Sequence, residues 1–165
     1  LNLHHNYYIL LVFAVLAVVA CQKSENHDAL SASTKGESVT KKNLNLVVLA
    51  KELSHAVLRS EEILLSIHDE RSLAKGRENM NNLNLSIKKI AAQMEQLEIP
   101  SDKTKQDIML DAKKVQDKLD KLVTKREKHA GKLPDKIKKG LYDVNWSFRE
   151  NWNALQSIFD KYLPS

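Results

Sequence analysis

From Lys41 to the end of the chain, apolar positions recur at alternating intervals of three and four residues, the spacing of one face of an α-helix. Four such segments follow one another, and each predicts an amphipathic helix with one buried face. In the order of the segments, the predicted core positions are Leu46, Leu49, Leu53, Ala56, Ser60, Ile63 and Ile67; Leu73, Gly76, Met80, Leu83, Ile87, Ile90, Met94 and Leu97; Ile108, Ala112, Val115, Leu119 and Leu122; and Ile137, Leu141, Val144, Phe148, Trp152, Leu155, Phe159 and Tyr162.

Local signals mark most of the boundaries between these segments. Pro100 predicts a helix end before it, and Ser101 has the character of an N-cap for the third segment. Gly131 ends the third segment, and Pro134 opens the fourth as its first helical residue. Between the first and second segments, residues 66–72 contain neither Gly nor Pro, so the sequence leaves open whether the two are separate helices.

Four amphipathic helices with short links predict an all-α fold, an up-down-up-down four-helix bundle over residues 41–165. The alternative is a pair of long helical hairpins that complete their core by dimerising, and the sequence leaves the oligomeric state open. The composition agrees with a helical protein, because only 5% of the 165 residues are aromatic and only four are Gly. The single Cys excludes an intramolecular disulfide.

Residues 1–20 contain no Asp, Glu, Lys or Arg, and the run from Tyr7 to Ala20 is entirely apolar or aromatic. As a helix this run would be about 21 Å long, which is shorter than the hydrocarbon core of about 30 Å that a membrane span must cross. The pattern favours a targeting segment that is not part of the fold.

The sequence Val18-Val19-Ala20-Cys21 resembles the lipobox of bacterial lipoproteins, in which small or aliphatic residues precede a Cys. The resemblance implies cleavage between Ala20 and Cys21 and attachment of lipid, palmitate among the acyl groups, at Cys21. Gln22 stands where an Asp would imply retention at the inner membrane, so the resemblance favours an anchor in the outer membrane with the protein facing the periplasm. It covers only the first two dozen residues, and residues 41–165 resemble no family.

Residues 22–40 are rich in Ser, Thr and charged side chains and carry only four apolar residues, too few to offset the entropy of ordering the chain. They predict a flexible tether. The expected organisation is therefore a cleaved signal peptide (1–20), the lipidated Cys21 with a disordered linker (21–40), and the helical domain (41–165).

No group of residues indicates catalysis. Glu52 and His55 have the Glu-x-x-His spacing of di-iron bundles, but the sequence contains no second copy. Met80 and Met94 lie in the core register of their segment, where Met usually fills gaps. We therefore expect no metal, no cofactor and no enzymatic activity.

The charge of the chain is concentrated in one region. Between Lys103 and Lys139 there are 13 Lys and Arg against 6 Asp and Glu, whereas the whole chain has a net charge of +5. Such a region can attract an anionic envelope polymer or lipid headgroups, and the expected location excludes nucleic acid. The alternative is a solubilising surface without a ligand. The candidate residues are Lys125, Arg126, Lys128, Lys132, Lys136, Lys138 and Lys139.

A second candidate surface lies on the fourth segment. Trp146 is off the core register, Tyr142 precedes it by about one turn, and Arg149 follows it by nearly one turn. Tyr, Trp and Arg are the residues most enriched at interface hot spots, so this row predicts a partner-binding surface. The alternative is that Trp146 covers a groove between neighbouring helices.

Together these patterns predict a lipid-anchored envelope protein that acts as a non-enzymatic binding or scaffolding module, through a protein partner or an anionic envelope polymer. Two alternatives stay open. One is a helical bundle that carries a cofactor or small ligand, and the other is an immunity or stress-response lipoprotein.

Overall fold

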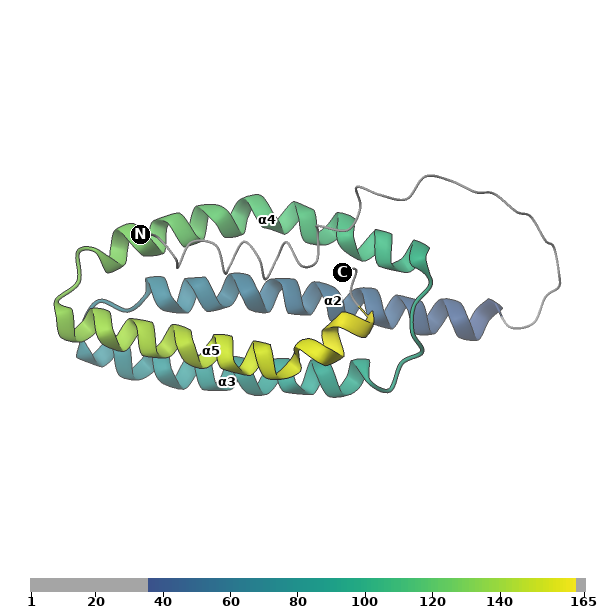
Figure 1. Ribbon diagram of the computed structural model, residues 1–165, viewed down its shortest axis with the longest axis horizontal. Helices are drawn as coiled ribbons and strands as arrows, with labels where there is room; N and C mark the ends of the chain where they lie inside the picture. Colours follow the sequence, from purple (N-terminus) through teal and green to yellow (C-terminus); the bar gives the residue numbers. More distant parts are fainter. Residues whose placement is uncertain (1–35, 163–165) are drawn as a thin grey trace.

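A computed structural model of the chain describes residues 36–162, with side chains for residues 45–162. This part of the protein contains helices and no strands, and the helices are α2 (Gly36–Leu65), α3 (Glu70–Met94), α4 (Asp102–Ala130) and α5 (Asp135–Tyr162) (Figure 1). The predicted all-α fold class is therefore confirmed for the described residues. The predicted signal peptide and Cys21 lie outside them.

Helix α2 begins earlier than the sequence pattern indicates. Residues 36–40, predicted to belong to the disordered linker, form its first turns, so this part of the domain boundary was wrong. The extension is favoured because a helix that has formed adds one hydrogen bond for each further residue.

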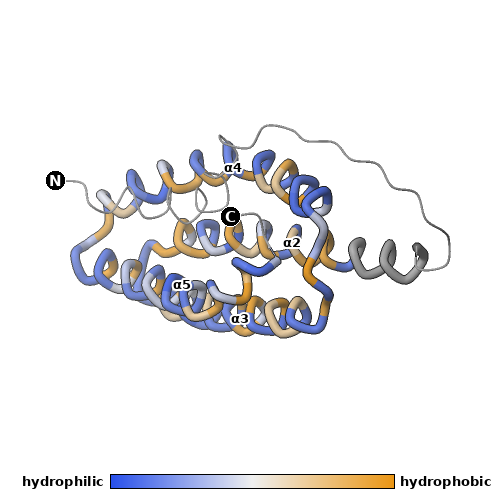
Figure 2. The backbone as a smooth tube through the Cα atoms, turned by 45° about the vertical axis from the view of Figure 1, so that its right-hand side comes forward, coloured by the Kyte–Doolittle hydropathy of each residue, from blue (hydrophilic) through white to orange (hydrophobic). Residues whose placement is uncertain are grey.

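The apolar stripes of α2, α3 and α5 form the main core. All of their predicted core positions are buried except Leu97 and Leu155, which are half-buried and pack against the core. On α5 the ring of Trp152 lies 6.1 Å from that of Phe148 and 4.8 Å from that of Phe159, centroid to centroid, so three aromatic side chains pack in a row along one helix face. Figure 2 shows apolar and polar residues alternating along each of these helices.

Helix α4 buries less of its predicted apolar face than the other three. Ile108 and Leu119 are buried, but Ala112, Val115 and Leu122 are only half-buried. The reason is its place in the fold: α4 packs mainly against α2 and makes few contacts with α5 (Figure 1). Helix α4 therefore buries fewer apolar side chains than α5, which packs extensively against α3.

Two pairs of helices run in parallel, because the polar contacts that join each pair follow the same order along both members. For α2 and α4 the contacts are Lys51 with Asp111, Glu61 with Arg126, and the Ile67 carbonyl with His129. For α3 and α5 they are Glu70 with Lys136, Asn84 with Ser147, and the Leu97 carbonyl with Tyr162.

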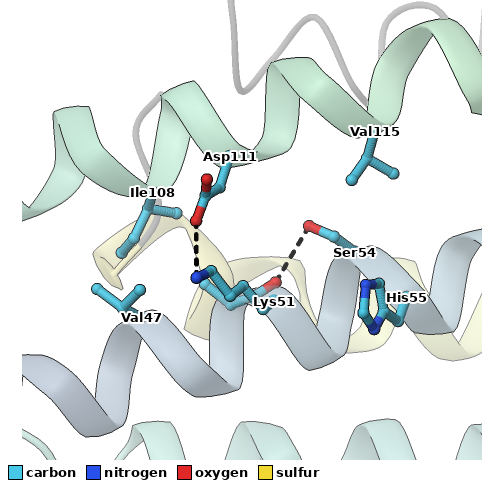
Figure 3. A pocket seen from close by; sticks show the side chains of 8 residues that line it. Val47, Lys51, Ser54, His55, Ile108, Asp111 and Val115 are labelled. Carbon is cyan, nitrogen blue, oxygen red and sulfur yellow. Dashed lines mark hydrogen bonds and ion pairs between the residues drawn. The ribbon is translucent and has the colours of Figure 1, made fainter.

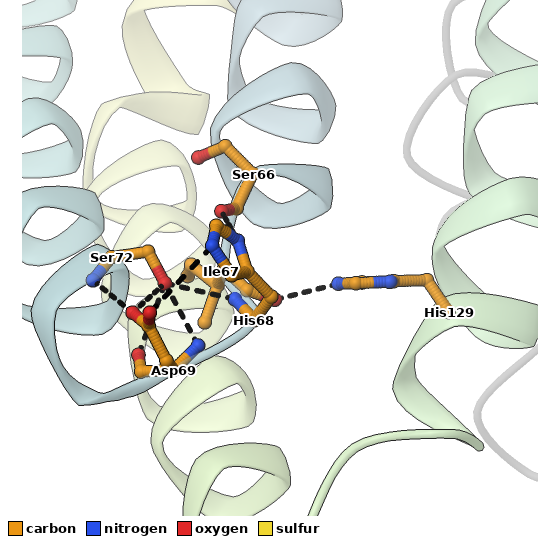
Figure 4. A network of polar contacts seen from close by, with 6 residues as sticks. All are labelled: Ser66, Ile67, His68, Asp69, Ser72 and His129. Atoms are coloured by element: carbon orange, nitrogen blue, oxygen red, sulfur yellow. Dashed lines mark hydrogen bonds and ion pairs between the residues drawn. The ribbon is translucent and has the colours of Figure 1, made fainter.

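The link between α2 and α3 settles the boundary that the sequence left open: the two are separate helices. Asp69 is the N-cap of α3, and its carboxylate accepts a hydrogen bond from the Ser72 backbone N–H at 2.7 Å (Figure 4). The Asp69 backbone N–H in turn donates to the Ser72 hydroxyl at 2.9 Å, which completes a capping box. The hydrogen bonds from Ser72 lower the pKa of Asp69, because they stabilise its ionised form.

The other boundaries follow the local signals closely. Ser101 caps α4 by accepting from the Thr104 backbone N–H at 3.3 Å, as predicted. Pro134 lies one residue before α5 instead of inside it, and its carbonyl accepts from the Lys138 N–H. Gly140 lets α5 approach α3 closely, because a Cβ at that position would clash with the side chain of Leu73.

Candidate functional site

The aromatic row predicted on α5 is exposed. Tyr142 retains 48% and Trp146 56% of its accessible surface, so Trp146 is not a buried cover of a groove. The guanidinium carbon of Arg149 lies 5.5 Å from the centroid of the Trp146 ring, a cation–π arrangement that holds the indole against its own helix. The three predicted residues therefore do come together on the surface.

The structure adds Leu85 to this row. The amide nitrogen of Asn84 on α3 donates to the Ser147 hydroxyl on α5 at 3.4 Å, so these two residues face each other across the seam. Leu85 comes one residue after Asn84 on α3, and Trp146 comes one residue before Ser147 on α5. Because the two helices are parallel, the side chains of Leu85 and Trp146 point to the same side of the α3–α5 contact. Leu85 is 56% exposed. Leu85, Tyr142, Trp146 and Arg149 thus form one outer face, here called the α3–α5 surface.

Sequence reasoning missed Leu85 for a physical reason. An isolated Leu outside the core register of a helix is a weak signal, because single exposed apolar residues are normal on protein surfaces. Only its position across the seam from Trp146 makes it part of a larger apolar patch.

The predicted basic residues gather at the end of the molecule where α4 ends and α5 begins. Lys125, Lys128, Lys132, Lys136 and Lys139 are exposed, and Lys138 is half-buried. The amine of Lys136 lies 2.6 Å from a carboxylate oxygen of Glu70 on α3. We call Lys125, Lys128, Lys132 and Lys139 the basic end.

Arg126 does not belong to this surface, and its assignment to an anion-binding face was wrong. Its Nε donates to Oε2 of Glu61 on α2 at 2.7 Å, and the two side chains are only 7% and 0% exposed. The Arg126 side chain points inward because it follows the core residue Leu119 by two helical turns and so lies on the same helix face. The positive charge of Arg126 therefore pairs with Glu61 in the protein interior.

Glu61 and Arg126 form a buried ion pair between α2 and α4. Burial raises the pKa of Glu61, since desolvation outweighs the opposing effect of the Arg126 charge. The second carboxylate oxygen, Oε1, is buried without a hydrogen-bond partner. The pair joins α4 to α2.

A small cavity between α2 and α4 has a volume of about 30 Å³ and is lined by apolar and polar side chains (Figure 3). The Lys51 amine spans it to reach Asp111 Oδ2 at 3.1 Å. This volume holds one or two water molecules, too little for an organic cofactor.

The Glu-x-x-His pair and the two core methionines lie in different environments. Glu52 and His55 are exposed on α2, whereas Met80 and Met94 are fully buried in the core. Among the residues that the structure describes, no three His, Cys, Asp or Glu side chains are grouped closely enough to hold a metal ion.

A comparison with protein-family models, curated proteins and solved structures finds no match to this chain. Across residues 36–162, none of the helices has an apolar stretch of the length needed to cross a membrane. The function must therefore be argued from the surfaces described above.

Proposed function

We propose that this protein is a lipid-anchored component of a bacterial envelope, held at the outer membrane through Cys21, that acts as a non-enzymatic scaffold for a protein partner. The anchor is supported by the lipobox resemblance of residues 18–21. The proposal includes the up-down-up-down order of the helices, which the two parallel pairs and the short links favour.

The observation that carries the scaffold role is the α3–α5 surface. Trp146, Tyr142 and Leu85 are three of the six large hydrophobic side chains that remain exposed in the described part of the chain, and they share one face. An aromatic residue with an adjacent Arg and an aliphatic neighbour has the composition of an interface hot spot. Grouped exposure of this kind on a helical domain indicates a binding surface.

The test is photo-crosslinking in the organism's own cells, with the full-length chain. One version carries the photoreactive residue at Trp146 and the other at Leu110, which is 58% exposed on α4 and lies outside the α3–α5 surface. We expect a discrete protein adduct from position 146 and none from position 110. The same adduct from both positions, or none from position 146, would overturn the scaffold role.

Two substitutions sharpen this experiment. Trp146→Ala, measured with a crosslinker at Leu85, should reduce capture at least tenfold, because hot-spot residues contribute about 2 kcal/mol or more to binding. Leu110→Ala is the matched control and should leave capture unchanged. Cys21→Ser should move the protein out of the membrane fraction; a variant that stays there would contradict the anchor but not the partner surface.

A further inference from the structure

The ends of the helical domain differ in their relation to the anchor. The chain enters at Gly36, the start of α2, whereas the basic end lies where α4 meets α5 (Figure 1). The basic end lies beside the C-terminal end of α2, because His129 Nε2 lies 2.6 Å from the Ile67 carbonyl oxygen, which accepts a hydrogen bond (Figure 4). With 30 residues, α2 is about 45 Å long, and this length separates the two ends.

The positive charge at the far end exceeds the negative charge there. Residues 121–139 contain eight Lys and Arg and two acidic residues, Glu127 and Asp135. Arg126 is turned inward to Glu61, and Lys136 pairs with Glu70, so neither adds a net charge to the surface. Asp69, a further acidic group at this end, caps α3, and Glu62 is exposed in the last turn of α2. The four lysines of the basic end remain exposed to solvent.

This charge is too far from the entry point of the chain to act on a membrane there. At physiological ionic strength the field of an exposed charge is screened over about 8 Å, much less than the length of α2. The proposed anchor at Cys21 precedes α2 in the chain, so a domain that stands upright on its anchoring membrane points the basic end away from that membrane.

The basic end also lacks the features of a protein-binding hot spot. The six exposed large hydrophobic side chains of the described residues lie outside the region from 111 to 139. Lysine is a flexible, strongly hydrated point charge, suited to a repeating polyanion more than to one shaped pocket.

We propose that the basic end binds an anionic cell-wall polymer, a glycan with carboxylate-bearing peptides, so that the protein bridges its anchoring membrane and the wall. The bridging part rests on the proposed anchor at Cys21. The polymer-binding part does not, because it concerns only the far end of the domain.

The experiment measures co-sedimentation of the detergent-solubilised full-length chain with isolated peptidoglycan sacculi, and in parallel with vesicles of phosphatidylglycerol and phosphatidylethanolamine. The test variant replaces Lys125, Lys128, Lys132 and Lys139 by Gln. The control variant makes the same change in charge at exposed lysines away from the basic end, by replacing Lys88, Lys89, Lys103 and Lys161 with Gln.

We expect the parent chain and the control variant to bind sacculi, and the test variant to bind roughly several hundredfold more weakly, since each of the four Lys near an anionic surface contributes a factor of about five. Added salt should weaken the binding. Equal loss in both variants, binding to vesicles in place of sacculi, or no binding to either would overturn the proposal. Because the assay depends neither on lipidation nor on the α3–α5 surface, a failure here is distinct from failure of the scaffold role.

Discussion

The two parallel helix pairs are joined by different chemistry. Between α2 and α4 the contacts include a buried ion pair, Glu61 with Arg126, and the fully buried apolar residues of α4 are few. Between α3 and α5 the ion pair of Glu70 with Lys136 is exposed to solvent. The less exposed contacts there are made by neutral groups, among them the amides of Asn84 and Asn151, set among large aromatic side chains. The place of α4 thus depends on specific polar partners, whereas that of α5 depends mainly on buried apolar area.

The two pairs show what determines which helices pack together in a chain of similar amphipathic helices. Apolar stripes can pack against one another in many combinations, because the hydrophobic effect is non-directional. A buried charge is strongly destabilising away from its partner, so Glu61 and Arg126 disfavour arrangements that separate them. We infer that this pair fixes the register of α4 on α2.

The largest effect is expected from breaking the ion pair on one side. Arg126→Ala leaves the Glu61 carboxylate buried without its cation, which should lower the free energy of unfolding by about 3–5 kcal/mol. Urea denaturation followed by circular dichroism measures this. The double variant Glu61→Leu with Arg126→Met, which removes both charges, should be close to the parent or more stable, and a double variant as unstable as Arg126→Ala would contradict this account.

The same pair predicts a pH dependence. The raised pKa of Glu61 means that the folded state holds its proton more tightly than the unfolded chain, whose value is near 4.5. Stability should therefore fall as pH rises from about 4.5 through the folded pKa. Glu61→Gln should remove this component of the pH profile, and an unchanged profile would show that Glu61 is not its source.

A smaller effect is expected from truncating the apolar contact of α4. Ile108→Ala should cost about 2–3 kcal/mol, because it removes one of the few fully buried apolar side chains of that helix. Hydrogen exchange should show the loss of protection confined to α4, with α5 little changed. Equal loss of protection in both helices would mean that α4 unfolds together with the rest of the domain.

The smallest effect is expected in the α3–α5 pair, where a substitution should raise the stability of the protein instead of lowering it. Asn151 is buried, its Oδ1 has no partner, and its Nδ2 donates to the Asn84 carbonyl only at 3.5 Å. Asn151→Leu removes the orphaned oxygen and should stabilise the protein by up to about 1 kcal/mol. Thermal unfolding measures the shift; a clear loss of stability would show that the long hydrogen bond contributes more than its geometry indicates.

Much of the local structure could be predicted from the sequence. The core stripes of three helices, the cap at Ser101 and the exposure of Tyr142 and Trp146 follow from periodicity and capping chemistry within a few turns of chain. The start of α2 at Gly36 could not, because helix extension into polar residues carries no periodic signal. The break before α3 was left open, although Asp69 and Ser72 carry its capping signal.

The sequence by itself determined that the described chain forms amphipathic helices and which face of each is apolar, because both properties depend on neighbours three and four residues away. Only the tertiary structure decided that α4 lies on α2, that Arg126 turns inward to Glu61 across 65 positions of sequence, and that Leu85 joins Trp146 on one surface. These outcomes depend on the register between helices, which brings together residues far apart in the chain and which no local pattern encodes.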